Sequence, residues 1–313
     1  MKSNASRTAI LVAFVVLAVA TLTGWVSPPV ALAFGLAFAL TLGNPIPQAS
    51  QKAAKTLLQW SVVGLGFGMN LHAVWDAGRT GFGFTVATIF GTLLLGWWLG
   101  RLLKVESQTS LLVSVGTSIC GGSAIAAVGA VLEADPRAMS VSLATVFVLN
   151  AVALFVFPPL GHFLGMDQSH FGLWSAIAIH DTSSVVGAAA KYGEQALTIA
   201  TTVKLSRALW IFPIALGLAF IKRRQKAKVK LPWFIFAFIA AAGVRTLFPQ
   251  GEIAYDTIKE VARLGLTLTL FLIGAGLSRD AIRTVGFRPM LQGVLLWLVV
   301  SVTGLLAVQN ILR

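Results

Sequence analysis

The sequence predicts an all-α polytopic membrane protein with about eleven transmembrane helices. Of its 313 residues, 57% are hydrophobic and only 11% are charged, whereas an average soluble domain is about 25% charged. The apolar residues form runs such as TAILVAFVVLAVATLTGWV and FTVATIFGTLLLGWWLG, close to the roughly 20 residues that cross about 30 Å of hydrocarbon as a helix. The alternating segments of about 10 residues that are typical of outer-membrane barrels are missing.

The apolar runs define the predicted spans. The first run follows Lys2 and Arg7, as in a signal peptide, but its apolar core exceeds the usual length of about 7 to 15 residues and a second run follows at once. We therefore expect it to be retained. No polar stretch is long enough to fold alone, so residues 1–313 should form a single transmembrane domain. The spans are expected at residues 8–25, 29–43, 56–72, 82–101, 109–132, 140–163, 172–190, 197–221, 231–249, 260–278 and 287–311.

The basic residues predict the orientation in the membrane. If the N-terminus is cytoplasmic, most lysines and arginines fall on the cytoplasmic side, including the cluster IKRRQKAKVK at 221–230 and the residues Arg279 and Arg283. This bias favours a multi-pass protein of the bacterial inner membrane with a periplasmic C-terminus. The net charge of +13 lies in short loops between apolar runs, so it predicts topology and no nucleic-acid partner.

Two pairs of similar short segments indicate an internal repeat. ICGGSAIAAVGA (119–130) resembles IHDTSSVVGAAA (179–190), but these segments run in the same direction and indicate a duplicated motif, not an inverted copy. GLGFGMNLHAV (64–74) resembles LIGAGLSRDAI (272–282), and the chain crosses in opposite directions at the two places. This relation is typical of inverted halves whose broken helices cross at the bilayer midplane. The halves would be 29–163 and 172–311, each of five helices, with the helix 8–25 as an extra element. Gly121 and Gly122 would mark one broken helix, and Gly274 and Gly276 the other.

Four ionisable residues lie within predicted spans: His180, Asp181, Lys204 and Arg207. At membrane depth such residues are functional-site candidates. Lys204 and Arg207 are three residues apart on one helical face, and Arg207 should lie about 15 Å into its span. Asp181 balances one of the two positive charges, which leaves one for a bound anion. The alternatives are a purely structural ion pair with Asp181, or snorkelling of Lys204 to the membrane surface.

The segments TSICGGS and HDTSS predict helix breaks. Gly121 and Gly122 allow the backbone to leave helical geometry, which is tolerated in a membrane around a cavity. The half-helix that follows begins with free N–H groups and partial positive charge, which attract anions. Ser123 stands where an N-cap is expected, with Ser183 and Ser184 in the matching place. Close packing of small residues is the alternative explanation.

The predicted site follows from these patterns. His180 and Asp181 would couple transport to protons, since imidazole titrates near neutral pH. The single cysteine excludes a disulfide framework or a multi-cysteine metal site, and we expect no metal and no cofactor. The residues expected to bind substrate are Ser118, Gly121, Gly122, Ser123, Ser183, Ser184, Lys204 and Arg207. The residues expected to line the cavity are Thr117, Cys120, Asn150, Asn70, Gly274 and Gly276.

Four motifs in this order, GTSICGGSAIAA, AIHDTSSVVGAA, VKLSRALWIFP and FLIGAGLSRDAI, resemble the YeiH-type (UPF0324) family of bacterial inner-membrane proteins, which are described as sulfate exporters. The resemblance covers nearly the whole chain. It implies a carrier of ten or eleven helices with the inverted-repeat architecture of bile-acid and sodium/proton antiporter-like carriers. The family site would include Gly121, Gly122, Ser123, His180, Asp181, Ser183, Ser184, Lys204 and Arg207.

These observations predict a secondary active transporter of a small oxyanion by alternating access, and the resemblance implies export of sulfate, sulfite or a small sulfonate. The P-loop of ATPases is missing, so the energy would come from an ion gradient. We expect the protein to bind a small anion and to lie in the lipid bilayer. A homodimer is one possible assembly. The alternatives are a sodium- or proton-coupled carrier of organic acids or a cation antiporter of the same fold, with Asp181 binding the cation. A passive channel and an intramembrane hydrolase using Ser183 or Ser184 with His180 are weaker, and we expect no enzyme.

Overall fold

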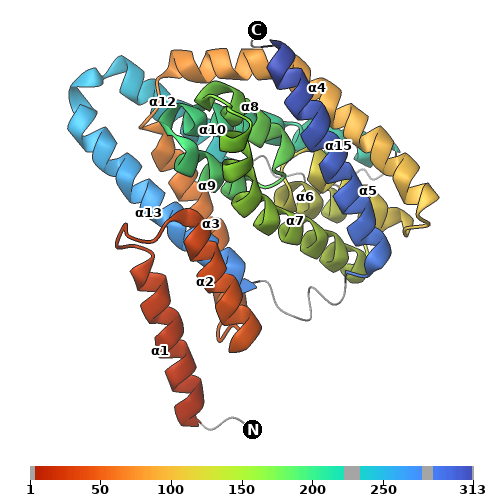
Figure 1. The fold of residues 1–313 in the computed structure, drawn as a ribbon, viewed down its shortest axis with the longest axis horizontal. Coiled ribbons are helices and arrows are strands. Elements are labelled where there is room, and N and C mark those ends of the chain that lie inside the picture. The colour runs from red at the N-terminus through yellow and green to blue at the C-terminus, as the bar shows by residue number, and fades with distance from the viewer. Residues whose placement is uncertain (1–3, 222–232, 277–284, 312–313) are drawn as a thin grey trace. The chain divides into compact units, whose positions relative to one another are not determined.

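The structure is a computed structural model that describes residues 4–221, 233–276 and 285–311. These residues are helical, with no strand among them. They divide into two compact units (Figure 1): the described residues of Met1–Val74 with Trp233–Asp280, and those of Trp75–Pro232 with Ala281–Arg313. The basic segment 222–230, Arg279 and Arg283, on which the predicted orientation partly rests, lie outside the described residues.

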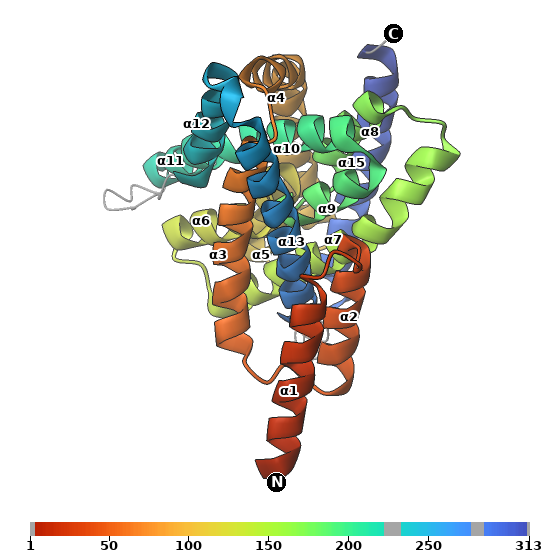
Figure 2. The ribbon, with the colours of Figure 1, turned by 90° about the vertical axis from the view of Figure 1, so that its left-hand side faces the viewer.

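The first unit is built around its longest helix, α13. Figure 2 shows α13 between α2 and α3, and it packs against both. Rings from three helices meet there, since Phe14 lies 5.4 Å from Phe38 and 5.2 Å from Phe271 between ring centroids. The helices of this unit are α1 (Asn4–Ala20), α2 (Pro28–Thr41), α3 (Pro47–Gly66), α12 (Trp233–Leu247), the 3-10 turn η1 (Pro249–Gly251) and α13 (Glu252–Gly276).

The helix break expected at Gly274 is not found, because α13 is continuous through this residue to Gly276, where the described stretch ends. Gly274 instead permits a close helix contact. A Cβ atom there would collide with the carbonyl oxygen of Leu32 in α2, and one on Gly35 would collide with that of Phe271 in α13. The small residues therefore let the two backbones approach, as in many membrane helix pairs.

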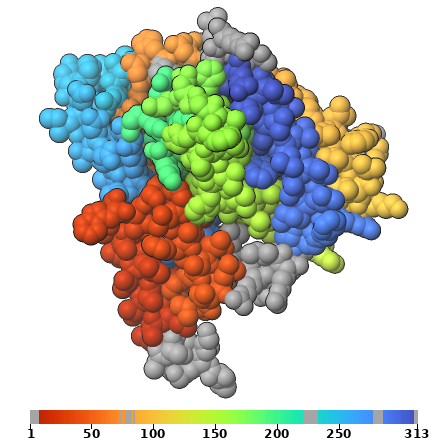
Figure 3. Space-filling model, viewed as in Figure 1, coloured from red at the N-terminus to blue at the C-terminus, as the bar shows by residue number. Residues whose placement is uncertain are grey.

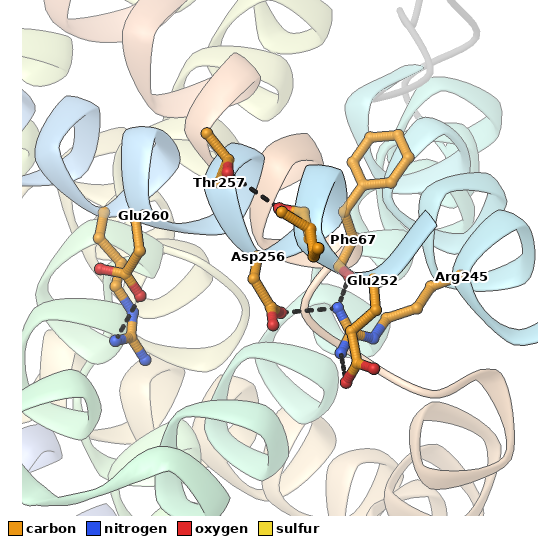
Figure 4. Close-up of polar contacts among 8 residues, drawn as sticks. Phe67, Arg245, Glu252, Asp256, Thr257 and Glu260 are labelled. Atoms are coloured by element: carbon orange, nitrogen blue, oxygen red, sulfur yellow. Dashed lines mark hydrogen bonds and ion pairs between the residues drawn. The ribbon is translucent and has the colours of Figure 1, made fainter. Parts of the chain in front are cut away.

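A polar cluster around Arg245 joins the residue that follows α3 to α12 and α13 within the first unit (Figure 4). The guanidinium donates to the carbonyl oxygen of Phe67 at 3.0 Å and to Asp256 at 2.8 Å, and it lies 3.6 Å from Glu252. The Phe67 ring also stacks on Tyr255. An open pocket of about 210 Å³ lies here, lined by Asn70, Arg245, Thr246, Pro249, Glu252 and Tyr255.

The second unit contains most of the helices. Carboxylates cap four of them, since Glu106, Asp135, Asp167 and Asp181 accept hydrogen bonds from amides in the first turns of α5, α7, α8 and α9, which satisfies N–H groups that have no intrahelical acceptor. The helices are α4 (Leu71–Leu102, from Trp75 onward in this unit), α5 (Ser107–Ser118), α6 (Gly122–Leu132), α7 (Pro136–Phe163), α8 (Gln168–Ala178), α9 (Thr182–Tyr192), α10 (Glu194–Leu209), α11 (Ile211–Ile221) and α15 (Phe287–Ile311).

Hydrogen bonds from buried side chains connect several helices of the second unit. The side chains of α15 lie against the segment that contains α8 (Figure 3), and Trp174 donates its indole N–H to the carbonyl oxygen of Ser301 at 2.8 Å. Gln292 of α15 is fully buried and donates to the carbonyl oxygen of Gly96 in α4 and to the hydroxyl of Ser110 in α5. These bonds connect α4, α5, α8 and α15.

The described helices agree with a membrane protein. Each predicted span overlaps a helix or a pair of helices, with α5 and α6 dividing 109–132, α8 and α9 dividing 172–190, and α10 and α11 meeting at Trp210 inside 197–221. The number of spans and the inverted repeat stay predictions. Among the described residues, four stretches are long and apolar enough to cross a bilayer: Thr85–Leu102, Pro136–Phe163, Glu194–Leu218 and Phe287–Gln309.

Candidate functional site

Two broken helices meet within the second unit, which confirms the breaks predicted in TSICGGS and HDTSS. Helix α5 ends at Ser118 and α6 begins at Gly122, while α8 ends at Ala178 and α9 begins at Thr182. Gly121 has φ 69° and ψ −129°, a conformation essentially reserved for glycine. A Cβ atom on Gly121 would lie 3.3 Å from the Cα and Cβ atoms of Asp181. We call this meeting point of the two breaks the crossing.

The guanidinium group of Arg207, a residue of α10, lies at the C-terminal end of α5. Its Nη2 donates to the carbonyl oxygen of Ser118 at 2.5 Å, and its Nη1 donates to the hydroxyl of Thr88 in α4 at 2.7 Å. The side chain is fully buried. Since the last carbonyls of a helix carry partial negative charge, Arg207 neutralises this helix end.

Lys204 lies one turn before Arg207 on α10, and its ammonium group lies at the C-terminal end of α8. Its ammonium donates to the carbonyl oxygens of Ile179 at 2.7 Å and Ala176 at 3.3 Å. It is fully buried, so Lys204 does not snorkel to a surface. Helix α10 thus presents one cation to each broken helix, whereas the spacing of the two residues had suggested that both reach one location.

Asp181 lies at the N-terminal end of α9. Its carboxylate accepts hydrogen bonds from the amides of Ser183 at 3.1 Å and Ser184 at 3.4 Å, and from the Ser183 hydroxyl. Asp181 is therefore the N-cap, and the expectation that Ser183 or Ser184 would hold this position was wrong. The side chain one residue before the first helical residue is the one that reaches these amides. Nor do Lys204 and Arg207 form an ion pair with Asp181 among these described residues, because both cations bind backbone carbonyls.

The N-terminal end of α6 differs from the other three helix ends. Its N-cap is Gly121, which has no side chain to cap with, and within the described chain the amides of Gly122 and Ser123 have no hydrogen-bond acceptor. Ser123 is exposed and is the second residue of α6, so the expectation that it would be the N-cap was also wrong. Three of the four helix ends carry a side chain of opposite charge, and this end does not.

The side chain of Asn150 in α7 binds the non-helical backbone of the second break. Its side-chain oxygen accepts from the backbone amides of His180 at 3.0 Å and Asp181 at 3.2 Å. These two amides belong to the non-helical segment between α8 and α9, where they have no helical partner. From the sequence, Asn150 was expected either to line a cavity or to form a hydrogen bond between helices, and the structure shows such a bond. Its position in the middle of an apolar span was the available signal for a polar role.

Several buried polar atoms near the breaks have no hydrogen-bond partner within the part of the chain that the structure describes. They are the hydroxyl of Thr117, Nδ2 of Asn150, both ring nitrogens of His180 and Nε of Arg207. A buried polar atom left unsatisfied costs about 1–3 kcal/mol. A bound polar ligand is one way in which such atoms are satisfied.

The remaining predicted residues lie as follows. The hydroxyl of Ser118 donates to the carbonyl oxygen of Val115, and Cys120 is buried and free. Asn70, Gly274 and Gly276 belong to the first unit, where Asn70 is an exposed residue whose side chain accepts from the amide of His72. Across the described residues, no group of three or more His, Cys, Asp or Glu side chains could hold a metal ion.

Comparison with known proteins identifies the family. The family model described as "conserved hypothetical protein 698" matches residues 7–293. A UPF0324 membrane protein of Bacteroides thetaiotaomicron is 54% identical over 285 residues, which cover 90% of this chain and 86% of the relative. The chain belongs to the UPF0324 family. A UPF0324 membrane protein of Geobacter sulfurreducens is 48% identical over 296 residues, 95% of each chain. No solved structure matches this UPF0324 chain.

Proposed function

We propose that this UPF0324 protein is a secondary active transporter of a small oxyanion, which binds at the N-terminal end of α6. The observation that carries the proposal is the unequal occupation of the four helix ends. Arg207, Lys204 and Asp181 neutralise three of them, whereas the α6 end has partial positive charge and free amides. Such an end is favourable for an anion.

The unpartnered side-chain atoms favour a ligand that accepts hydrogen bonds. Arg207 Nε and Asn150 Nδ2 are buried and lack partners in the described chain, and both groups can only donate. The amides of Gly122 and Ser123 are also donors. A sulfur oxyanion offers several acceptor oxygens in a small volume, so it suits a site that supplies donor groups better than a cation would.

The broken helices support a carrier. Non-helical backbone at membrane depth is tolerated where it lines a cavity or lies inside protein, and secondary transporters bind substrates at such discontinuous helices. The family resemblance adds sulfate, sulfite or a small sulfonate as substrate and export as the direction. In this account His180 and Asp181 couple the movement to protons, and two alternately accessible states expose the crossing.

A tethered carboxylate at the α6 end provides a direct test. Ser123 is exposed and is the second residue of α6, so Ser123→Asp places an anion at the free helix end without disturbing packing. We expect purified protein to gain thermal stability with sulfite, methanesulfonate or sulfate, since a ligand at 100 times its Kd stabilises by about 2.7 kcal/mol. The Ser123→Asp variant should keep its fold and lose this gain in stability. The Ser123→Asn variant should retain the gain, because asparagine has nearly the shape of aspartate but no charge.

The opposite results would overturn the proposal. If no anion stabilises the wild-type protein, or if Ser123→Asp leaves the anion effect intact, the α6 end is not the binding site. A sodium-dependent gain in stability that is lost in Asp181→Asn would favour the cation-coupled carrier instead.

A further inference from the structure

The crossing contains two basic side chains and one acidic side chain. Lys204 and Arg207 are fully buried, and Asp181 lies at the second break. The two helix C-termini and two helix N-termini contribute partial charges of about half a unit each, which cancel in sum. With these groups ionised, the crossing has one positive charge more than it has negative charges.

The surrounding helices do not change this count. The breaks at 116–124 and 176–184 add only Cys120 and His180 as further titratable side chains. The inner part of α7 (141–157), the part of α4 at 83–100 that includes Thr88, and α11 (Ile211–Ile221) contain no ionisable residue. The balance therefore depends on Asp181, Lys204 and Arg207, with His180 and Cys120 uncharged.

We propose that the crossing accepts a single net negative charge, so that its substrates are monovalent oxyanions such as sulfonates or hydrogen sulfite. A divalent anion such as sulfate then binds together with a proton, which Asp181 or His180 receives. This inference rests on the proposed function. Its physical basis is that a charge left without a counter-charge in a desolvated site is costly, whereas a monoanion makes the crossing neutral.

The test compares two tetrahedral anions of similar size and different charge. Methanesulfonate is a monoanion and sulfate a dianion between pH 6 and 8, and their Kd values for the purified full-length protein can be measured by calorimetric titration. At pH 8 we expect methanesulfonate to bind at least about tenfold more tightly, a difference of about 1.4 kcal/mol. Its affinity should stay constant between pH 8 and 6, while that of sulfate rises with proton uptake.

Asp181→Asn changes the charge of the crossing and keeps its shape. Asparagine is a good N-cap, so it can still accept from the amides of Ser183 and Ser184. The crossing then has two excess positive charges, and we expect the ratio of affinities to move at least about tenfold toward sulfate. Asp135→Asn is the matched control, because Asp135 caps α7 through the amide of Arg137, and it should leave the ratio unchanged.

The outcomes separate this inference from the proposed function. If sulfate binds as tightly as methanesulfonate at pH 8, or if Asp181→Asn retains the wild-type ratio while its unfolding transition remains cooperative, the charge inference is wrong and the anion site stands. If neither anion binds to the wild-type protein, the proposed function fails and the charge inference fails with it.

Discussion

Gly121 packs against the backbone of Asp181, so that a Cβ atom at Gly121 would lie 3.3 Å from both Cα and Cβ of Asp181. This contact joins the two broken helices at their non-helical segments. It places the free N-terminal end of α6 next to the residue that caps α9. A Cβ atom at this distance would push Asp181 aside slightly, and the positive φ of 69° independently favours glycine.

Gly121→Ala should therefore destabilise the protein by about 1–3 kcal/mol, because alanine is strained in this conformation and its methyl group meets Asp181. The measurement is the midpoint of thermal unfolding in detergent. Gly91→Ala is the control, since a Cβ at this exposed position in α4 has nothing within 4 Å and alanine favours a helix. Equal midpoints for the two variants would contradict the packing described here.

Asn150→Ala should cost about 1–3 kcal/mol, because the buried amides of His180 and Asp181 lose their acceptor. Asn70→Ala is the matched control. Asn70 also accepts from a backbone amide, that of His72, but it is exposed, so water can replace it and the loss should be about 1 kcal/mol or less. Comparison of the two unfolding midpoints checks this. A larger loss for Asn70→Ala would show that Asn150 does not hold the break.

Arg245→Met should lower the unfolding midpoint more than Arg263→Met. The two side chains are similarly exposed, at 22% and 26%. Arg245 joins Phe67 to Asp256 across three chain segments (Figure 4), and losing such bonds costs about 1–3 kcal/mol. Arg263 pairs with Glu260 one turn away on the same helix, and such exposed pairs contribute about 0.3–0.5 kcal/mol. Equal losses would contradict a linking role for Arg245.

Asp167 should make stability depend on acidic pH. The backbone amide and side chain of His170 donate to it at 2.8 Å, and these bonds hold the pKa of the Asp167 carboxyl below its usual value. Its contribution is thus present above the unfolded-state pKa of about 3.9 and is lost as the pH falls through the lower folded-state pKa. The effect should be small, since the side chain is 63% exposed.

Asp167→Asn provides the comparison, because asparagine also caps a helix but does not titrate in this range. We expect the fall in unfolding midpoint between pH 5 and pH 2 to be smaller in this variant than in the wild-type protein. An identical fall in both proteins would show that Asp167 does not contribute to the acid sensitivity.

The sequence was informative about the crossing where small and polar residues occur together. The glycine pair 121–122 is surrounded by hydroxyls, and His180 and Asp181 precede two serines. Hydroxyls and charges add nothing to plain apolar packing, so both segments could be predicted as breaks. Gly274 has only apolar residues and glycine as near neighbours on its N-terminal side, and α13 is unbroken there; the residues after Gly276 lie outside the described residues. Glycine alone does not distinguish a break from a close helix contact.

The partners of the buried charges could not be predicted from the sequence. Lys204 and Arg207 were expected to face Asp181 or an anion, but they bind the carbonyl oxygens of Ile179, Ala176 and Ser118. Every residue has a carbonyl, so the sequence contains no sign of which one a cation meets. The hydroxyl of Thr88 accepts a hydrogen bond from Arg207. This contact could not be predicted either, because Thr88 is far from Arg207 along the chain.

Anion counterflow in proteoliposomes tests the central claim most directly. Vesicles loaded with unlabelled sulfite or methanesulfonate are diluted into a trace of the same labelled anion. The account predicts transient, saturable accumulation of label that requires the internal anion, persists in Ser123→Asn and is lost in Ser123→Asp. Absence of accumulation for both anions, or flux that rises in proportion to concentration without exchange, would contradict an anion carrier.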